Sequence, residues 1–192
     1  MRKNVAVEPP GQMRLFVAVD MPQTVVDEVR RIQDYFKKQE LFNGRYTKPE
    51  DVHITMKFLG EVSTDLALQI DQALKTISCN GMHAHLSSLD VFSAGSKIKI
   101  LFLNIICPEL AVLAKQIDTA LADLFAIEQR PFVSHATLAR VKAVENREKL
   151  CAAINQFTVN KIEFTIDQFV LKQSELSTDG PTYTDIARYK LY

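Results

Sequence analysis

The chain has 192 residues, 47% of them hydrophobic and 24% charged, which is an ordinary composition for one substantial globular domain or two small lobes. The formal net charge is zero, which argues against a broad basic surface for non-specific nucleic-acid binding. A protein that binds only the end of a nucleic acid is still compatible with this charge. The three cysteines are scattered and form no C-x-x-C motif, which argues against a disulfide framework and a zinc knuckle.

The opening residues and the hydropathy of the chain predict a soluble cytoplasmic protein. Residues 1–12 are expected to form a flexible leader, because two prolines and a glycine interrupt the stretch and the apolar core of a signal peptide is missing. The longest apolar run is far shorter than a membrane span. Isolated thiols fit a reducing compartment. We therefore expect a cytoplasmic monomer without membrane contact.

The spacing of apolar residues predicts strands and helices from residue 13 to the end of the chain, since a period of two indicates strands and spacings of three or four indicate helices. In the first half the pattern predicts a strand at 14–21, a helix at about 22–40, a loop at 43–50, a strand at 52–59 and a helix at 64–78. In the second half it predicts strands at 83–92 and 97–106, a helix at 109–126, a strand at 135–141, a short helix near 145–156 and strands near 159–173 and 182–191. A similar order thus occurs loosely twice, which predicts an α+β fold of two similar lobes in a single bilobal domain over 13–192.

Two tripeptides of the form His-x-Thr each begin an apolar-rich strand. The first opens HITMKFLG at His53, and the second opens HATLAR at His135 in the other half of the chain. Apolar and polar residues alternate along both strands, which places His53 beside Thr55 on one face and His135 beside Thr137 on one face. Two such strands facing across a cleft would bring two histidines and two threonines together.

That set of side chains has a definite chemical use. A histidine titrates near neutrality, so one ring can be neutral while the other is protonated. The neutral ring can take a proton from water and the protonated ring can give one to a leaving oxygen, each transfer contributing roughly 10²–10⁴-fold in rate. Threonine hydroxyls can donate to the non-bridging oxygens of a phosphate held between the rings. A lone His-x-Thr is usually structural, but two matched copies favour phosphodiester chemistry without a metal or a cofactor.

From Met13 to Tyr192 the sequence resembles the RNA 2′,3′-cyclic phosphodiesterase (2′–5′ RNA ligase-like) family of the 2H phosphoesterase superfamily. The resemblance rests on four segments in the family's order: MRLFVAVDMP, YTKPEDVHITMKFLG, PFVSHATLAR and SELSTDGPTYTDIARYKL. It implies two pseudo-symmetric lobes, each an antiparallel sheet with outer helices, and an active site in the groove between them. Tyr46 stands where the family often has Trp, but all four histidine and threonine positions match.

Carried over residue by residue, the resemblance implies that His53 and His135 are catalytic and that Thr55, Thr137 and Arg140 bind substrate. The implied reaction is metal-independent opening of a 2′,3′-cyclic phosphate at an RNA terminus to a 2′-phosphate. We assign His53 as the acid toward O3′ and His135 as the base toward water, although the sequence leaves the reverse assignment open. The resemblance also implies reversible 2′–5′ RNA ligation, by microscopic reversibility, and RNA 3′ ends or nucleotide cyclic phosphates as partners.

Two other functions stay open from the sequence. The same four residues can act on small cyclic phosphates, such as ADP-ribose cyclic phosphate, or on 2′–5′ oligonucleotides, and a wall that stacks a base would discriminate among these substrates. A module that only holds RNA ends, without turnover, would be expected to lack one of the histidines, and both are present.

Strand parity bears on three further residues. Arg140 has the wrong parity for the face of His135, so it reaches the phosphate only if the strand ends or bulges before it. Strict alternation gives Lys57 the face of Thr55, where it is either a ligand or a solvated charge. The same alternation places Phe58 in the core.

Phe16 is a further candidate for substrate binding, and His83 with His85 is a candidate for metal binding. Phe16 lies on the face of its strand opposite Leu15 and Val17, so it either offers its ring to a terminal base or packs in the core. His83 and His85 are two residues apart on a predicted strand, but no cysteine or carboxylate accompanies them at ligand spacing. We therefore expect no metal site.

Overall fold

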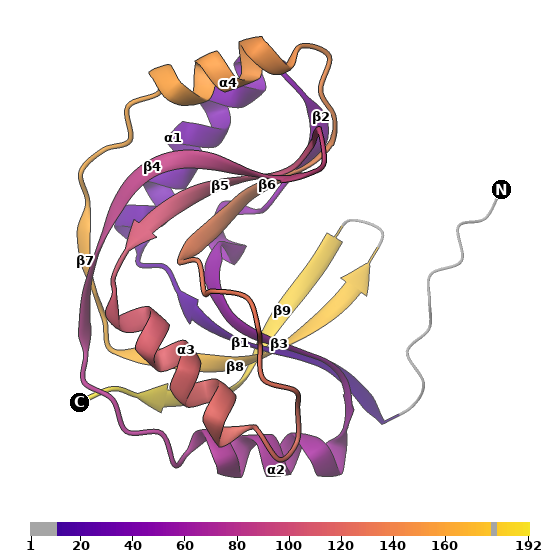
Figure 1. Ribbon diagram of the computed structural model, residues 1–192, viewed down its shortest axis with the longest axis vertical. Coiled ribbons are helices and arrows are strands. Elements are labelled where there is room, and N and C mark those ends of the chain that lie inside the picture. Colours follow the sequence, from indigo (N-terminus) through magenta and orange to yellow (C-terminus); the bar gives the residue numbers. More distant parts are fainter. Residues whose placement is uncertain (1–10, 178–179) are drawn as a thin grey trace, which may run out of the picture.

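The computed structural model describes residues 11–177 and 180–192, so the first ten residues of the predicted leader lie outside the described part of the chain. Within it, nine strands form one antiparallel sheet in the order β7-β4-β5-β6-β3-β1-β8-β9, with β2 paired to β6 (Figure 1). The strands are β1 (Gln12–Asp20), β2 (Asn43–Tyr46), β3 (His53–Ser63), β4 (Met82–Ala94), β5 (Lys97–Ile106), β6 (His135–Ala143), β7 (Glu163–Ile166), β8 (Gln168–Ser177) and β9 (Gly180–Lys190). The helices are α1 (Gln23–Gln39), α2 (Thr64–Leu74), α3 (Glu109–Ala120) and α4 (Arg147–Gln156), with a 3₁₀ turn η1 (Pro49–Asp51).

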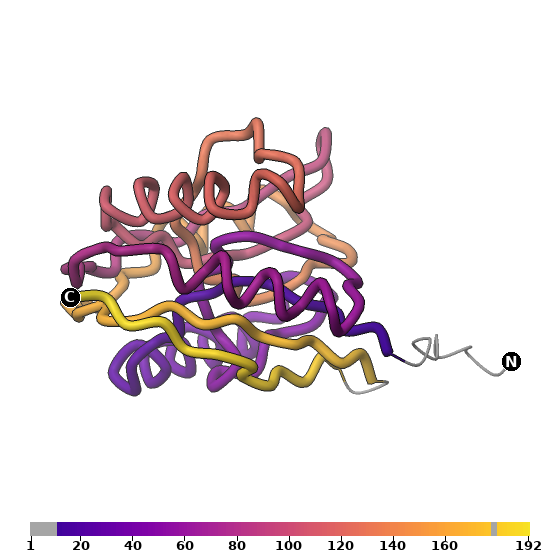
Figure 2. Tube along the Cα trace, turned by 90° about the horizontal axis from the view of Figure 1, so that it is seen from below, coloured from indigo at the N-terminus to yellow at the C-terminus, as the bar shows by residue number. Residues whose placement is uncertain are grey.

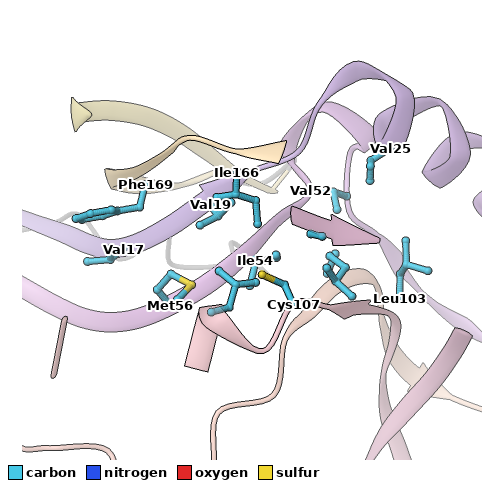
Figure 3. Packing of buried hydrophobic residues seen from close by; sticks show 14 of the residues in the cluster. Val17, Val19, Val25, Val52, Ile54, Met56, Leu103, Cys107, Ile166 and Phe169 are labelled. Carbon is cyan, nitrogen blue, oxygen red and sulfur yellow. The ribbon is translucent and has the colours of Figure 1, made fainter. Parts of the chain in front are cut away.

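The sheet consists of two halves that meet at one residue pair. Lobe one contains β3, β1, β8 and β9, and lobe two contains β7, β4, β5, β6 and β2. In the described register, β3 and β6 pair at Ile54 and Ala136 alone. Both side chains are fully buried, and Ile54 lies in the same apolar cluster as Val19 and Met56 (Figure 3). Ile54 and Ala136 are the middle residues of the two His-x-Thr tripeptides, so the motifs cross at their centres.

Helices α1 and α3 are exchanged between the lobes, whereas α2 stays on lobe one. Helix α1 follows β1 of lobe one, yet its Gln33 donates to the carbonyl of Leu138 on β6 of lobe two. Helix α3 follows β5 of lobe two, yet its Asp118 forms an ion pair with Lys57 on β3 of lobe one. Figure 2 shows α2 beside the C-terminal strands, where the Tyr189 hydroxyl of β9 donates to Asp71. The predicted α+β architecture of two lobes with outer helices is confirmed, and the exchange interlocks the two lobes.

Local sequence signals explain where the helices begin. The Ser63 hydroxyl accepts from the backbone N–H of the third residue after it, and Asn146 caps α4 in the same way. Pro22 is the residue before α1, where its missing N–H costs nothing. None of the helices in the described part of the chain is long and apolar enough to cross a membrane.

Two sequence predictions of secondary structure are wrong. The loop predicted at 43–50 contains β2 and η1, because the backbone of this polar segment pairs with β6. The single strand predicted near 159–173 is divided into β7, which pairs with β4, and β8, which pairs with β1 and β9. The chain therefore passes from the edge of lobe two into lobe one between Ile166 and Gln168. Apolar residues stand on both sides of the break, and only the polar pair Asp167 and Gln168 separates them.

Each His-x-Thr strand contains a β-bulge directly after its threonine. In β6 the residues on either side of Leu138 pair with consecutive residues of β5, which leaves Leu138 as an extra residue. In β3, Met56 is the extra residue opposite β1. An extra residue reverses the alternation of faces beyond it. The bulges therefore decide which side chains after the two motifs share the face of Thr55 and Thr137.

A buried glutamine holds the bulge of β6. The side chain of Gln33 is 1% exposed, and its Nε2 donates to Leu138 O at 3.0 Å and to Thr47 O at 2.7 Å. Backbone carbonyls that lose their donor in a buried place destabilise the fold. Helix α1 thus contributes a polar contact that fixes the strand geometry beside the second motif.

We predict that Gln33→Leu lowers the free energy of unfolding by about 1–3 kcal/mol, because it removes two hydrogen bonds that the buried Gln33 side chain donates, one to Leu138 O and one to Thr47 O. Urea unfolding followed by circular dichroism measures the change. Gln39→Leu, an exposed change on the same helix, is the matched control and should shift stability by less than about 0.5 kcal/mol. Equal stability of the two variants would contradict the role given to Gln33.

Candidate active site

The crossing of β3 and β6 brings the four predicted side chains to one face of the sheet. His53 and Thr55 flank Ile54, and His135 and Thr137 flank Ala136, so all four lie around the single paired position. Their middle residues are buried against the helices, whereas the four side chains are only half-buried. We call the face that carries His53, Thr55, His135 and Thr137 the His–Thr face.

Both histidines are oriented by the same backbone contact. His53 Nδ1 lies 2.8 Å from Asp51 O, and His135 Nδ1 lies 2.8 Å from Val133 O. A carbonyl oxygen only accepts hydrogen bonds, so each Nδ1 carries the proton and donates. Each neutral ring therefore keeps Nε2 as its free acceptor, and each protonated ring has an Nε2–H to donate. The two motifs present the same nitrogen for proton transfer.

Aromatic rings pack against His53. The ring centroids of Phe16 and His53 are 5.0 Å apart, and Tyr183 meets His53 edge-on at 5.2 Å. Phe16 is only 3% exposed, so its contact with His53 leaves little surface for stacking a terminal base, the binding role predicted for it. Phe58, 6.2 Å from Phe16 between ring centroids, is 70% exposed. Substrate binding by Phe16 stays a prediction, and Phe58 offers the larger free ring.

His135 has an equivalent pair of aromatic neighbours. Phe92 meets the imidazole edge-on at 4.9 Å and Phe102 at 5.2 Å between ring centroids. These residues come from the β4–β5 hairpin, whereas Phe16 and Tyr183 come from the two ends of the chain. Sequence reasoning missed Phe92, Phe102 and Tyr183, because a ring on a β-strand looks the same whether it fills a core or holds a histidine in place.

Burial lowers the pKa of both histidines from the ordinary value. For His53 burial is the largest cause, the Asp51 carbonyl and Asp20 oppose it, and the positive charges of Lys172 and His135 lower the pKa further. For His135 burial again lowers the pKa, and the Val133 carbonyl opposes it. Both rings thus bind a proton less readily than a free histidine, and a proton on one opposes a proton on the other.

A partly buried ion-pair network adjoins His53. Lys172 on β8 is 8% exposed, and its Nζ lies 2.9 Å from Asp20 and 2.5 Å from Asp185. Asp20 lies directly opposite His53 in the β1–β3 register. Arg188 on β9 also pairs with Asp20 and Asp185. No local pattern in the sequence marks this network, because Asp20 lies on β1, far along the chain from the β8–β9 hairpin that carries its partners.

The bulges determine on which face of the sheet the residues after the two motifs lie. Leu138 and Ala139 are both fully buried, and Arg140 is exposed on the His–Thr face. The condition that strand parity sets for Arg140, a bulge before it, is met. Lys57 instead points to the helix side and pairs with Asp118, and Phe58 is exposed, so both parity predictions for β3 are wrong. Strict alternation fails there because Met56 is an extra residue.

His83 and His85 lie elsewhere, exposed on β4, where they pair with Thr165 and Glu163 of β7. Among residues 11–177 and 180–192, no group of three or more His, Cys, Asp or Glu side chains is arranged to hold a metal ion.

The sequence profile of the LigT like phosphoesterases matches residues 19–102 and 106–183, one segment for each His-x-Thr motif. The chain belongs to the LigT-like phosphoesterase family. Its similarity to an RNA 2′,3′-cyclic phosphodiesterase of Methanocaldococcus jannaschii is 30% identity over 181 residues, covering 92% of this chain and all of the relative. An RNA 2′,3′-cyclic phosphodiesterase of Methanothermobacter thermautotrophicus is 29% identical over 94% of this chain and 100% of its own length.

Solved structures of LigT-like phosphoesterases and related proteins share the fold. TT0787 of Thermus thermophilus superimposes with a TM-score of 0.76 at 24% identity, covering 93% of this chain and 97% of that one. E. coli LigT in apo form gives a TM-score of 0.72 at 23% identity, covering 94% and 98%. E. coli LigT has also been crystallised with 3′-AMP. The 2H phosphoesterase fold that the resemblance implied is confirmed.

We predict that Lys172→Met raises the pKa of His53, because it removes a nearby positive charge and takes from Asp20 the nearer of its two cations. NMR titration of the imidazole signals measures the pKa. In the unsubstituted protein both His53 and His135 should titrate below about 6.5, the ordinary value. Lys190→Met, an exposed change on β9, is the control. An unchanged or lowered pKa for His53 in Lys172→Met would contradict the electrostatic role of Lys172.

Proposed function

We propose that the protein opens 2′,3′-cyclic phosphates at RNA 3′ ends to 2′-phosphates, without a metal ion. The observation that supports this most strongly is the crossing at Ile54 and Ala136, which places two free Nε2 atoms and two threonines on one face. The names of relatives such as the Methanocaldococcus jannaschii RNA 2′,3′-cyclic phosphodiesterase support the same substrate.

In this proposal the phosphorus lies between the two rings. His135, neutral, takes a proton from water through Nε2 as the water oxygen bonds to phosphorus. His53, protonated, gives its Nε2 proton to O3′ as the bond between phosphorus and O3′ breaks. Thr55 and Thr137 donate to the non-bridging oxygens and stabilise the charge that grows on them. After release of the 2′-phosphate the two histidines have exchanged protonation states, and solvent restores them.

A 5′-hydroxyl in the place of water would give 2′–5′ ligation through the same steps. The attacking oxygen then belongs to a second RNA, O3′ still leaves, and the product is a 2′–5′ phosphodiester. By microscopic reversibility the same residues cleave that bond again. Ligation therefore needs no side chain beyond those already placed on the His–Thr face.

The test is an assay with a chelator present, on a short RNA that ends in a 2′,3′-cyclic phosphate. We expect a 2′-phosphate product, identified by ³¹P NMR. His53→Ala and His135→Ala should each lower kcat by at least about 10²–10⁴-fold, because each removes one proton transfer. Thr55→Ala and Thr137→Ala should each cost about 1.5–3 kcal/mol of transition-state stabilisation.

His83→Ala, which removes an exposed histidine from β4, is the control for these variants and should retain full activity. Thermal unfolding confirms that the variants fold. A 3′-phosphate product, activity that needs an added metal, or full activity in either His53→Ala or His135→Ala would refute the proposed function.

We predict a bell-shaped dependence of kcat/KM on pH with its maximum below about pH 6.5. Activity falls at low pH because the base gains a proton, and at high pH because the acid loses one. Since the pKa values of both His53 and His135 are lowered, both limbs move to lower pH than two ordinary histidines would give. The measurement is kcat/KM across the acidic and mildly alkaline range at constant ionic strength, and a maximum well above about pH 7 would contradict the prediction.

A further inference from the structure

Two arginines lie directly opposite each other where β2 meets β6. Arg45 and Arg140 are partners in the antiparallel register, so their side chains share a face and start about 5 Å apart. Like charges in this arrangement destabilise a sheet. Among the described residues neither arginine forms an ion pair. The fold therefore places side by side two guanidinium groups that are unpaired within the described part of the chain, an arrangement that favours the binding of an anionic ligand.

The arginine pair borders the candidate active site. Arg140 lies three residues beyond Thr137 on the same face. Because Leu138 is an extra residue in the bulge, the two lie opposite β5 residues that are only two positions apart, which is about 7 Å along a strand. That length is comparable to one nucleotide of an extended RNA chain. An anion bound by Arg45 and Arg140 would therefore occupy a separate position, adjacent to that of a phosphate bound at Thr137.

Arg45 reaches the opposite lobe. Its guanidinium lies against Gly180 at the start of β9, in the space that a Cβ at this position would occupy. Gly180 also adopts a φ of +127°, which favours glycine. Arg45 thus extends from β2 of lobe two to the β8–β9 hairpin of lobe one.

Electrostatics connects these cations to the catalytic histidines. Burial raises the pKa of Tyr183, Asp51 raises it further, and the charges of Arg140, Arg45 and Arg14 lower it. The arginines therefore lie within electrostatic reach of the Tyr183 phenol. The Tyr183 ring in turn contacts His53. The arginine pair therefore lies at the border of the His–Thr face, and Tyr183 lies between the pair and His53.

We propose that Arg45 and Arg140 form a binding site for a second phosphate, the diester that joins the terminal nucleotide to the rest of an RNA chain. The planar, forked guanidinium groups suit the bidentate recognition of phosphate oxygens. This inference rests on the proposed function and specifies its substrate class: an oligonucleotide with a cyclic phosphate end is preferred to a cyclic mononucleotide, which has no second phosphate.

The test compares two substrates, adenosine 2′,3′-cyclic phosphate and the dinucleotide ApA ending in a 2′,3′-cyclic phosphate. We expect the unsubstituted protein to favour the dinucleotide in kcat/KM. Arg45→Gln should lower kcat/KM for the dinucleotide by about 10- to 100-fold, mainly through KM, and leave the mononucleotide within about threefold. It should also reduce the salt slope of log kcat/KM for the dinucleotide by about 0.7, the value for one lost phosphate contact on a single strand.

Two further variants separate a specific contact from general charge. Arg14→Gln removes an exposed cation that also acts on Tyr183 but lies opposite Glu61, and it should leave the preference for the dinucleotide intact. Arg45→Lys keeps the charge without the fork and should give an intermediate loss. Equal losses on both substrates in Arg45→Gln, or the same loss in Arg14→Gln, would overturn the proposal.

A binding measurement keeps this proposal distinct from the proposed function. Calorimetry compares the affinities of ApA carrying a 2′-phosphate and of adenosine 2′-monophosphate. Tighter binding of the dinucleotide that is lost in Arg45→Gln supports the second phosphate site even if the protein turns over neither substrate. Equal affinities for the two products refute the site even if cyclic phosphate ends are cleaved.

Discussion

The structure depends on one backbone pairing, between Ile54 of β3 and Ala136 of β6. The two strands diverge on both sides of this pair, so the sheet continues from lobe one to lobe two through a single position. Both side chains are buried, and the apolar cluster that encloses them extends through both lobes. A shift of one residue in this register would exchange buried for exposed positions in a His-x-Thr motif. The core that fixes the register therefore also fixes the relative position of the two histidines.

The two motifs share a backbone geometry but differ in the side chains beyond them. Each histidine donates from Nδ1 to the carbonyl two residues before it, and each threonine precedes a bulged residue. Beyond the bulge, lobe two presents Arg140 and lobe one presents Phe58, which is 70% exposed. The two histidines and two threonines are thus arranged almost symmetrically, with a cation on the lobe-two side and an aromatic ring on the lobe-one side.

The two histidines of the site have lower pKa values than free histidines, so they bind protons less readily. Burial lowers both pKa values, and the Lys172 network adds a positive charge beside His53 that Asp20 partly offsets. A phosphate bound between the rings would change this balance, because an anion favours a proton on an adjacent imidazole. The proposed acid would then acquire its proton together with the substrate, which couples substrate binding to the protonation state that the reaction needs.

The candidate chemistry and most of the helices and strands could be predicted from the amino-acid sequence. Paired His-x-Thr strands, the strand–helix order and the identity of His53, His135, Thr55 and Thr137 all follow from local alternation, and local alternation is visible in the chain. The geometry beyond the motifs depends on how the strands pair in the folded protein. Leu138 and Met56 are bulged because β5 and β1 pair with residues on either side of them, and no local pattern marks that choice. Arg45, Gly180, Tyr183 and Lys172 meet the site through long-range pairing, since strand order is set by the packing of the whole core and not by neighbours in sequence.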